Sequence, residues 1–133
     1  MPAGMQRTYI DTTDRFTLYY RELNRELERA GVTIVESPGE ATAIFSVYAD
    51  ETGQRVLSVS ARNVPTEFEV FYRVRYGVVS GTTVLVETQD ISRTQDYIYD
   101  TTVVLGKAAE EEKLRAALVD DLVRFITRQL SVQ

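Results

Sequence analysis

The chain has 133 residues, a formal net charge of −5, and neither cysteine nor histidine. These absences exclude disulfides, thiol or histidine nucleophiles, and metal sites built on Cys or His. Hydrophobic residues make up 44% and charged residues 26%, a globular balance that fits one domain over residues 1–133. We expect residues 1–4 to be an artificial or flexible start. The acidic charge argues against a nucleic-acid partner, and no apolar run could span a bilayer.

The first part of the chain predicts a strand, a helix and a short return. Residues 5–10 read as a strand, and residues 15–30 as an amphipathic helix with candidate N-caps at 11–14. The apolar residues of this helix recur every three or four positions: Phe16, Tyr19, Tyr20, Leu23, Leu27 and Ala30. Gly31 stands where a left-handed helix stop is favourable, and residues 32–35 look extended.

The middle of the chain is rich in β-branched and aromatic residues. Residues 43–50 and 55–61 predict strand, either as a hairpin turning at 51–54 or as one long bent strand. The clearest strand is 66–76, where one face carries Phe68, Val70, Tyr72, Val74 and Tyr76, and the other Glu67, Glu69, Phe71, Arg73 and Arg75. A turn at 77–81 leads to a strand at 82–92, and residues 94–100 are expected to leave the sheet.

A second amphipathic helix is expected from about residue 103. Its apolar stripe consists of Leu114, Ala117, Leu118, Leu122, Phe125, Ile126 and Leu130. The predicted order is therefore β-α-β-β-β-α. Because two helices can cover only one face of a roughly four-stranded sheet, we predict an α+β two-layer sandwich. The uncovered face should be polar, and Phe71 among its charges suggests a partner.

The residue types available for catalysis are few. Without His or Cys, an enzyme would need Ser or Tyr beside Lys, or paired carboxylates. The only lysines are Lys107 and Lys113, and the adjacent Asp120 and Asp121 would diverge on a helix. No glycine-rich phosphate loop, calcium loop or RNA-binding sheet motif is present. We therefore expect a binding or assembly module that is not an enzyme and uses no metal or cofactor.

Short motifs follow one another in a recognisable order. The aromatic and acidic segment 92–100 precedes Leu105-Gly106-Lys107, an acidic run at 110–112, and Arg128-Gln129-Leu130. Upstream lie Gly31-Val32 after the first helix, and Ala61-Arg62-Asn63 before Glu67-Phe68. Together, from about Arg7 to Leu130, this set resembles the LPS-assembly lipoprotein family (LptE, rare lipoprotein B).

The resemblance implies a function. Members of that family are lipid-anchored at the periplasmic face of the outer membrane of Gram-negative bacteria. They plug and help to assemble the large LptD-type β-barrel that inserts lipopolysaccharide, and they bind lipopolysaccharide themselves. The lipid-modified Cys of the family is absent here, so we expect the anchor to lie outside this sequence. The alternative is an auxiliary periplasmic lipoprotein of a lipid-transporting ABC system.

The resemblance also implies site residues. Arg62 and Lys107 match basic positions implicated in lipopolysaccharide contact, and the residue pattern places both near turns. A barrel lumen is polar, and Tyr combines an apolar ring with a hydrogen-bonding tip. The candidate barrel contacts are Phe71, Arg73, Arg75, Tyr97 and Tyr99.

Overall fold

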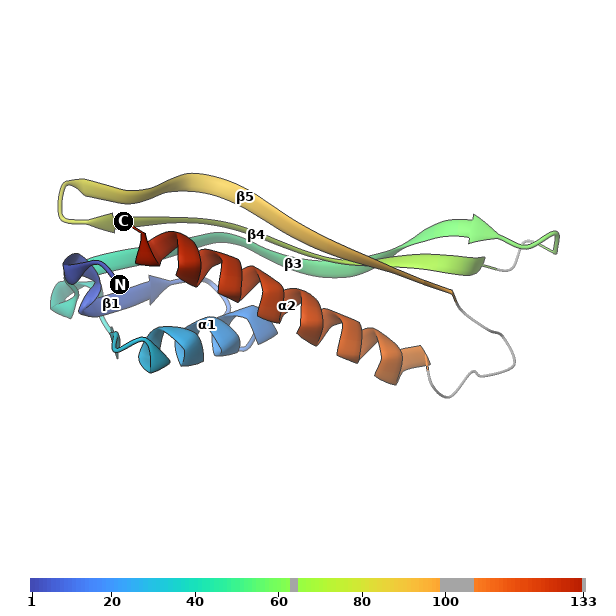
Figure 1. The fold of residues 1–133 in the computed structure, drawn as a ribbon, viewed down its shortest axis with the longest axis horizontal. Helices are drawn as coiled ribbons and strands as arrows, with labels where there is room; N and C mark the ends of the chain where they lie inside the picture. Colours follow the sequence, from blue (N-terminus) through green and yellow to red (C-terminus); the bar gives the residue numbers. More distant parts are fainter. Residues whose placement is uncertain (63–64, 99–106, 133) are drawn as a thin grey trace.

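The computed structural model describes residues 1–62, 65–98 and 107–132. Within them, two helices cover one face of a five-stranded sheet of order β2-β1-β3-β4-β5 (Figure 1). The strands are β1 (Arg7–Asp11), β2 (Thr33–Val35), β3 (Ala43–Val59), β4 (Pro65–Ser80) and β5 (Thr83–Ile98). The helices are α1 (Leu18–Arg29) and α2 (Lys107–Ser131). The predicted α+β two-layer sandwich is confirmed.

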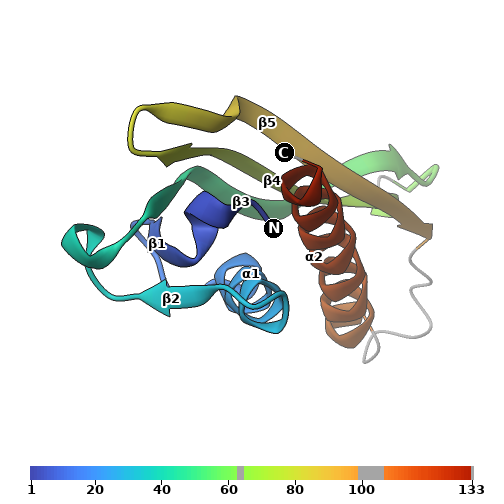
Figure 2. The ribbon, with the colours of Figure 1, turned by 60° about the vertical axis from the view of Figure 1, so that its left-hand side comes forward.

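The sheet combines parallel and antiparallel parts. β1 is parallel to both β2 and β3, whereas β3, β4 and β5 form an antiparallel meander. β1 pairs only with 43–46 of β3, so the rest of β3 runs on without it. The long strands project beyond the short ones and past the start of α2, as Figures 1 and 2 show. The return at 32–35 is itself an edge strand, which is why the sheet has five strands and not four.

The inward face of β4 follows the predicted alternation. Its five apolar residues are at most 5% exposed, and they are Phe68, Val70, Tyr72, Val74 and Tyr76. They pack against the buried faces of the helices, formed on α1 by Tyr19, Leu23 and Leu27, and on α2 by Leu118, Val119, Leu122, Val123, Ile126 and Leu130. A single apolar core therefore lies between the sheet and the two helices.

The start of α1 differs from its prediction. The helix begins at Leu18, and its N-cap is Thr17, whose Oγ1 accepts the backbone N–H of Tyr20 at 3.0 Å. The same hydroxyl donates to the Asp50 carboxylate on β3, which fixes the cap to the sheet. Phe16 therefore precedes the helix and is 90% exposed, so its prediction as a buried residue is wrong.

Three strands are longer than predicted, and β4 runs on to Ser80 through the turn expected at 77–81. β3 runs unbroken through 51–54, so the long-strand alternative is correct and no hairpin turns there. β5 continues to Ile98, which pairs with Glu67, so the segment from Thr94 does not leave the sheet at once. The stacking of Tyr97 on Phe68, with ring centroids 5.5 Å apart, holds this extension in place.

The first residues of the chain are ordered against the body. A 3-10 turn covers Ala3–Met5, and Met5 is fully buried. The Thr42 hydroxyl donates to the Gly4 carbonyl at 2.6 Å. The described start therefore contacts the body of the domain, and whether it is flexible stays a prediction. None of the described helices has the length and apolar character needed to span a membrane.

Buried tyrosines should make the fold sensitive to alkaline pH. Burial raises the pKa of Tyr76 from 10.0 to about 12, and burial with the Asp50 hydrogen bond raises the pKa of Tyr72 further. A raised pKa means that the folded state favours the neutral phenol. This stabilisation is complete below pH 10, and it is lost as the pH rises through about 12.

We expect the melting temperature to fall steeply between pH 10 and 12, the interval between the ordinary and the raised pKa of Tyr76. Tyr76→Phe should flatten this fall, whereas Tyr48→Phe should not, because Tyr48 is 63% exposed. Thermal melts with tyrosinate absorbance would measure both effects. Parallel curves for all three proteins would contradict the assignment.

Candidate functional site

The sheet face that points away from the helices carries charged and aromatic side chains across three strands. Residues directly paired on neighbouring strands share a face, so the register defines this surface. We call it the outer face, and its residues are Glu51, Gly53 and Arg55 on β3, Glu69, Phe71, Arg73 and Arg75 on β4, and Asp90, Ser92, Thr94 and Asp96 on β5. Neither helix covers it (Figure 2).

An ion-pair network crosses the outer face. Arg73 contacts Glu51 at 3.1 Å on one side and Asp90 at 2.6 Å on the other. Asp90 also lies 3.7 Å from Arg75. Hydrogen bonding and attraction from Asp90, then from Glu51, raise the pKa of Arg73, so its charge is permanent. Exposed pairs of this kind add little stability, but they fix the direction of the side chains.

Phe71 lies in the middle of this charged surface. A Cβ atom added at Gly53, directly opposite, would come within 3.1 Å of the Phe71 ring. The Arg55 guanidinium stacks on the ring, 4.2 Å from its centroid, and also bonds Glu69 at 2.6 Å. The ring is therefore half-buried between a glycine and a cation, and its remaining surface faces outward.

Beside the ion-pair network the outer face is hollowed. An open depression of about 610 Å³ is lined by Tyr48, Ala49, Glu51, Arg73, Arg75 and Thr88. Tyr48 is 63% exposed at its rim. Such a shallow, polar hollow with an aromatic rim suits a side chain of a protein partner better than an enclosed small molecule.

The structure gathers three of the five candidate barrel contacts. Phe71, Arg73 and Arg75 share the outer face. Tyr97 lies on the inner face, where its hydroxyl donates to Glu111 of α2, and Tyr99 lies outside the described residues. Alternation predicted the first three, but the side on which Tyr97 falls depends on its pairing with Phe68.

The two candidate lipopolysaccharide residues belong to one end of the molecule. Arg62 is exposed just after β3, and its backbone N–H donates to Ser60 Oγ at 3.2 Å. Lys107 is the first residue of α2, and its side chain lies outside the described part of the chain. Figure 1 shows the end of β3 and the start of α2 toward the same end of the long axis. The structure gives no distance between the two charged groups.

The sequence reasoning missed Tyr48 and Arg55. A register shift between Val47 and Ala49 interrupts the alternation on β3 at Tyr48, so a period of two does not predict its direction. The role of Arg55 depends on Phe71, which is distant in sequence. Local sequence provides no signal for it, because Arg55 lies between Gln54 and Val56 and no alternation there assigns a face.

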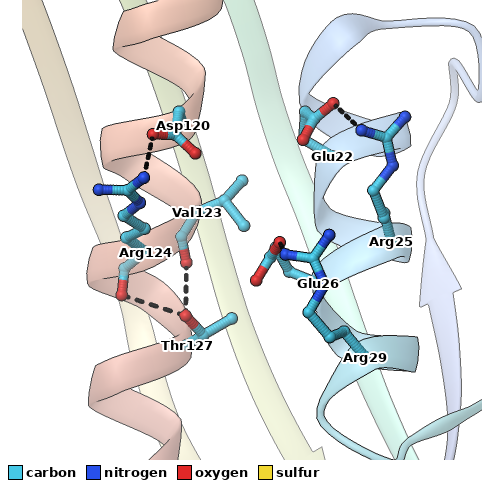
Figure 3. A network of polar contacts seen from close by, with 8 residues as sticks. All are labelled: Glu22, Arg25, Glu26, Arg29, Asp120, Val123, Arg124 and Thr127. Atoms are coloured by element: carbon cyan, nitrogen blue, oxygen red, sulfur yellow. Dashed lines mark hydrogen bonds and ion pairs between the residues drawn. The ribbon is translucent and has the colours of Figure 1, made fainter.

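Several charged side chains of the two helices form ion pairs within their own helix. Ion pairs join residues three or four positions apart within each helix: Glu22 with Arg25, Glu26 with Arg29, and Asp120 with Arg124 (Figure 3). The outer face differs, because its pairs join separate strands.

These features define the class of the protein. Among the described residues, no group of three or more Asp or Glu side chains could hold a metal ion. The carboxylates Glu51, Glu69 and Asp90 are each paired with arginine, so none is arranged as a general acid or base beside a second carboxylate. The fold is a two-layer α+β sandwich whose second sheet face is broad, ion-paired and not covered by either described helix.

The comparison with protein families identifies the chain more closely. It belongs to the lipopolysaccharide-assembly family LptE, whose model matches residues 5–130. This family is non-enzymatic, as the residue types had predicted. The comparison with curated proteins gave no match.

Solved structures share the fold over nearly the whole chain. Lipoprotein B from Nitrosomonas europaea is 29% identical, with a TM-score of 0.79 over 96% of this chain and 83% of its own. Rare lipoprotein B from Shewanella oneidensis is 20% identical, with a TM-score of 0.78 over 95% of this chain and 94% of its own. A minor lipoprotein from Acinetobacter baumannii is 19% identical, with a TM-score of 0.77 over 98% of this chain and 94% of its own.

Proposed function

We propose that this protein is an outer-membrane lipoprotein, anchored at the periplasmic face, that fills the lumen of an LptD-type barrel and binds lipopolysaccharide. Membership of the lipopolysaccharide-assembly family supports the process. The observation that carries the barrel partnership is the outer face, which no described helix covers and whose charged side chains, apart from Asp96, are paired with one another.

The chemistry of the outer face fits the wall of a barrel. A lumen wall is polar and hydrated, and hydrogen bonds through water are tolerated in such interfaces. Ion-paired side chains such as Arg73 and Asp90 can meet a polar wall without leaving a bare charge behind. The exposed part of Phe71, with Tyr48 nearby, adds the apolar contact that gives an interface affinity.

Co-expression with the candidate LptD-type barrel tests the partnership. We expect a one-to-one complex from solubilised outer membranes, and we expect Phe71→Glu to reduce its yield at least tenfold. The substitution removes the aromatic contact and places a second acid beside Glu69. The melting temperature of the isolated protein should change by only a few degrees, because Phe71 is half-buried.

Phe125→Glu is the matched control, since Phe125 is an exposed aromatic residue beside an arginine, but it lies on α2, on the opposite side of the sheet. It should leave the complex intact. A folded protein that forms no complex with the barrel would contradict the proposal, and recovery of an inner-membrane ABC transport complex in its place would support the alternative. A large loss of stability in Phe71→Glu would mean that the ring acts in the fold.

Lipopolysaccharide binding is proposed for the end of the molecule that carries Arg62 and Lys107. Phosphate groups require basic side chains, and an acidic protein must supply them locally. We expect Arg62→Glu/Lys107→Glu to weaken binding of purified lipopolysaccharide at least tenfold, measured by titration. Both residues lie at chain bends or helix ends, so the melting curve should hardly change.

A second double variant, with the same change in net charge at two other exposed residues, provides the control. Arg21 and Lys113 are exposed on α1 and α2, and neither has a carboxylate partner within the described residues. Arg21→Glu/Lys113→Glu should bind lipopolysaccharide nearly as the parent protein does. Equal weakening by both double variants would show a general charge effect and not a site.

A further inference from the structure

The described sheet has three stretches of strand edge that pair with no other described strand. β2 offers only three residues. The free edge of β3 is interrupted by register shifts at Val47/Ala49, Val56/Ser58 and Ser58/Val59. The edge of β5 over residues 89–98 is different, because its pairing with β4 runs without a shift from Gln89 to Ile98. Proteins usually interrupt or shorten exposed edges, so this regular one stands out.

Side chains of β5 itself occupy part of this edge. The Ser92 carbonyl accepts from Arg93 Nη1 at 2.9 Å, and the Asp96 carbonyl accepts from Gln95 Nε2 at 3.2 Å. Backbone groups on alternate residues of a strand point the same way, so Ser92, Thr94 and Asp96 direct their groups to one side. Carbonyls that are engaged in the β4 ladder would not need these bonds. We therefore assign the outward direction to these three residues.

The charged residues in one row across the sheet indicate that a positive charge is missing beside β5. Arg55, Glu69 and Asp96 lie side by side on β3, β4 and β5. Arg55 bonds Glu69 at 2.6 Å, whereas Asp96 has no ion-pair partner among the described residues. Two acids directly opposite each other on neighbouring strands are unfavourable. A cation on a strand added beyond β5 would relieve the repulsion.

A second copy of this chain does not provide that cation. If two β5 edges paired antiparallel, residues of the outer face would meet residues of the outer face. On β5 these are Asp90, Ser92, Thr94, Asp96 and Ile98, and none of them is basic. A parallel pairing would bring Asp96 beside the inner-face Arg93, which is already paired with Asp121 at 2.6 Å. The charge pattern thus favours a different polypeptide.

We propose that the β5 edge over residues 89–98 accepts an extended segment of the barrel partner, which carries Lys or Arg opposite Asp96. The inference rests on the proposed function and adds the mode of contact. Backbone hydrogen bonds provide the affinity of such strand addition, and the side chains on alternate positions provide its selectivity. The added strand would extend the outer face, so both surfaces would belong to one interface.

Two variants in the barrel complex test the inference. Thr94→Pro removes an N–H that points outward, so the hydrogen bonds between β4 and β5 remain. Strands accept proline at such positions only on the edge of a sheet. Asp96→Lys replaces the proposed partner of that Lys or Arg with a residue of the same charge, which would repel it. Each should lower the yield of the complex at least tenfold, while Asp96→Lys should leave the isolated protein as stable as before, or more stable, since the clash with Glu69 is removed.

Hydrogen exchange gives the second readout. The outward amides of Ser92, Thr94 and Asp96 should exchange at least tenfold more slowly in the complex than in the free protein. Glu36→Lys is the control of equal charge change, because Glu36 is exposed and lies after β2, at the opposite edge of the sheet. It should form the complex normally.

The outcomes separate the two proposals. A complex that tolerates both variants and leaves these amides unprotected overturns the strand addition and leaves the proposed function standing. Absence of any complex with the parent protein overturns both. Protection that appears in the free protein as its concentration rises would point to self-association and overturn the choice of partner. If Thr94→Pro does not fold, Asp96→Lys and the exchange data decide.

Discussion

Replacing Asp50 with alanine should lower the melting temperature by about 7 °C, equivalent to about 2 kcal/mol for a domain of this size. The Asp50 carboxylate accepts the hydroxyl of Thr17, and it accepts the hydroxyl of Tyr72 at 2.6 Å. Both donors are half-buried or buried, so the variant leaves each hydroxyl hydrogen without its acceptor, although both oxygens still accept a backbone N–H. Thermal or urea unfolding of the isolated protein would measure the loss.

A double-mutant cycle identifies the cause of this loss. If the cost comes from the Tyr72 hydroxyl losing its acceptor, Asp50→Ala combined with Tyr72→Phe should be less destabilising than the sum of the two single changes. Asp11→Ala, on an exposed carboxylate, should stay within about 0.5 kcal/mol. A loss of similar size for Asp50→Ala and Asp11→Ala would contradict the role assigned to Asp50.

The Asp50 contacts explain why part of the fold was not predictable. The residues at 11–14 are good N-caps in isolation, and a local pattern favours them. The actual cap, Thr17, is selected by a carboxylate 33 residues further along the chain. Such a choice depends on tertiary structure, and sequence periodicity carries no information about it.

Strand extent shows the same limit. β3 passes through Glu51-Thr52-Gly53-Gln54, which local propensity assigns to a turn. It continues because β4 pairs along its whole length, and because Gly53 leaves room for the Phe71 ring. By contrast, the two faces of β4 were predictable, since strict alternation depends only on the pleat of a strand.

The candidate site was predictable to the same degree. Phe71, Arg73 and Arg75 belong to the regular part of β4, so their common face followed from the sequence. Tyr48 beside a register shift, and Asp96 beyond the expected end of β5, required the structure. The inferred edge is therefore a feature that no single stretch of sequence displays.

Replacing Leu122 with alanine should have the largest effect on stability, about 3 kcal/mol or about 10 °C in melting temperature. Leu122 is fully buried where α2 packs on the sheet, so its loss leaves a cavity. Leu114→Ala should cost about 1 kcal/mol, because Leu114 is only partly buried in the first half of the helix. Urea unfolding of both variants would give the two values, and equal losses would contradict the assignment.

The difference between the halves of α2 should also appear in hydrogen exchange. The second half is held by buried apolar residues, whereas the first is held mainly by polar contacts, such as Tyr97 to Glu111 and Arg115 Nε to Thr52 Oγ1 at 3.1 Å. Segments with few apolar contacts open locally at lower free energy. We expect amides in 118–130 to be protected at least tenfold more than those in 109–117. Equal protection would mean that the polar contacts hold the helix as firmly as the core does. With the expected gradient, a partner meets the outer face in the middle of the long strands and an adjustable helix start toward the end that carries Arg62.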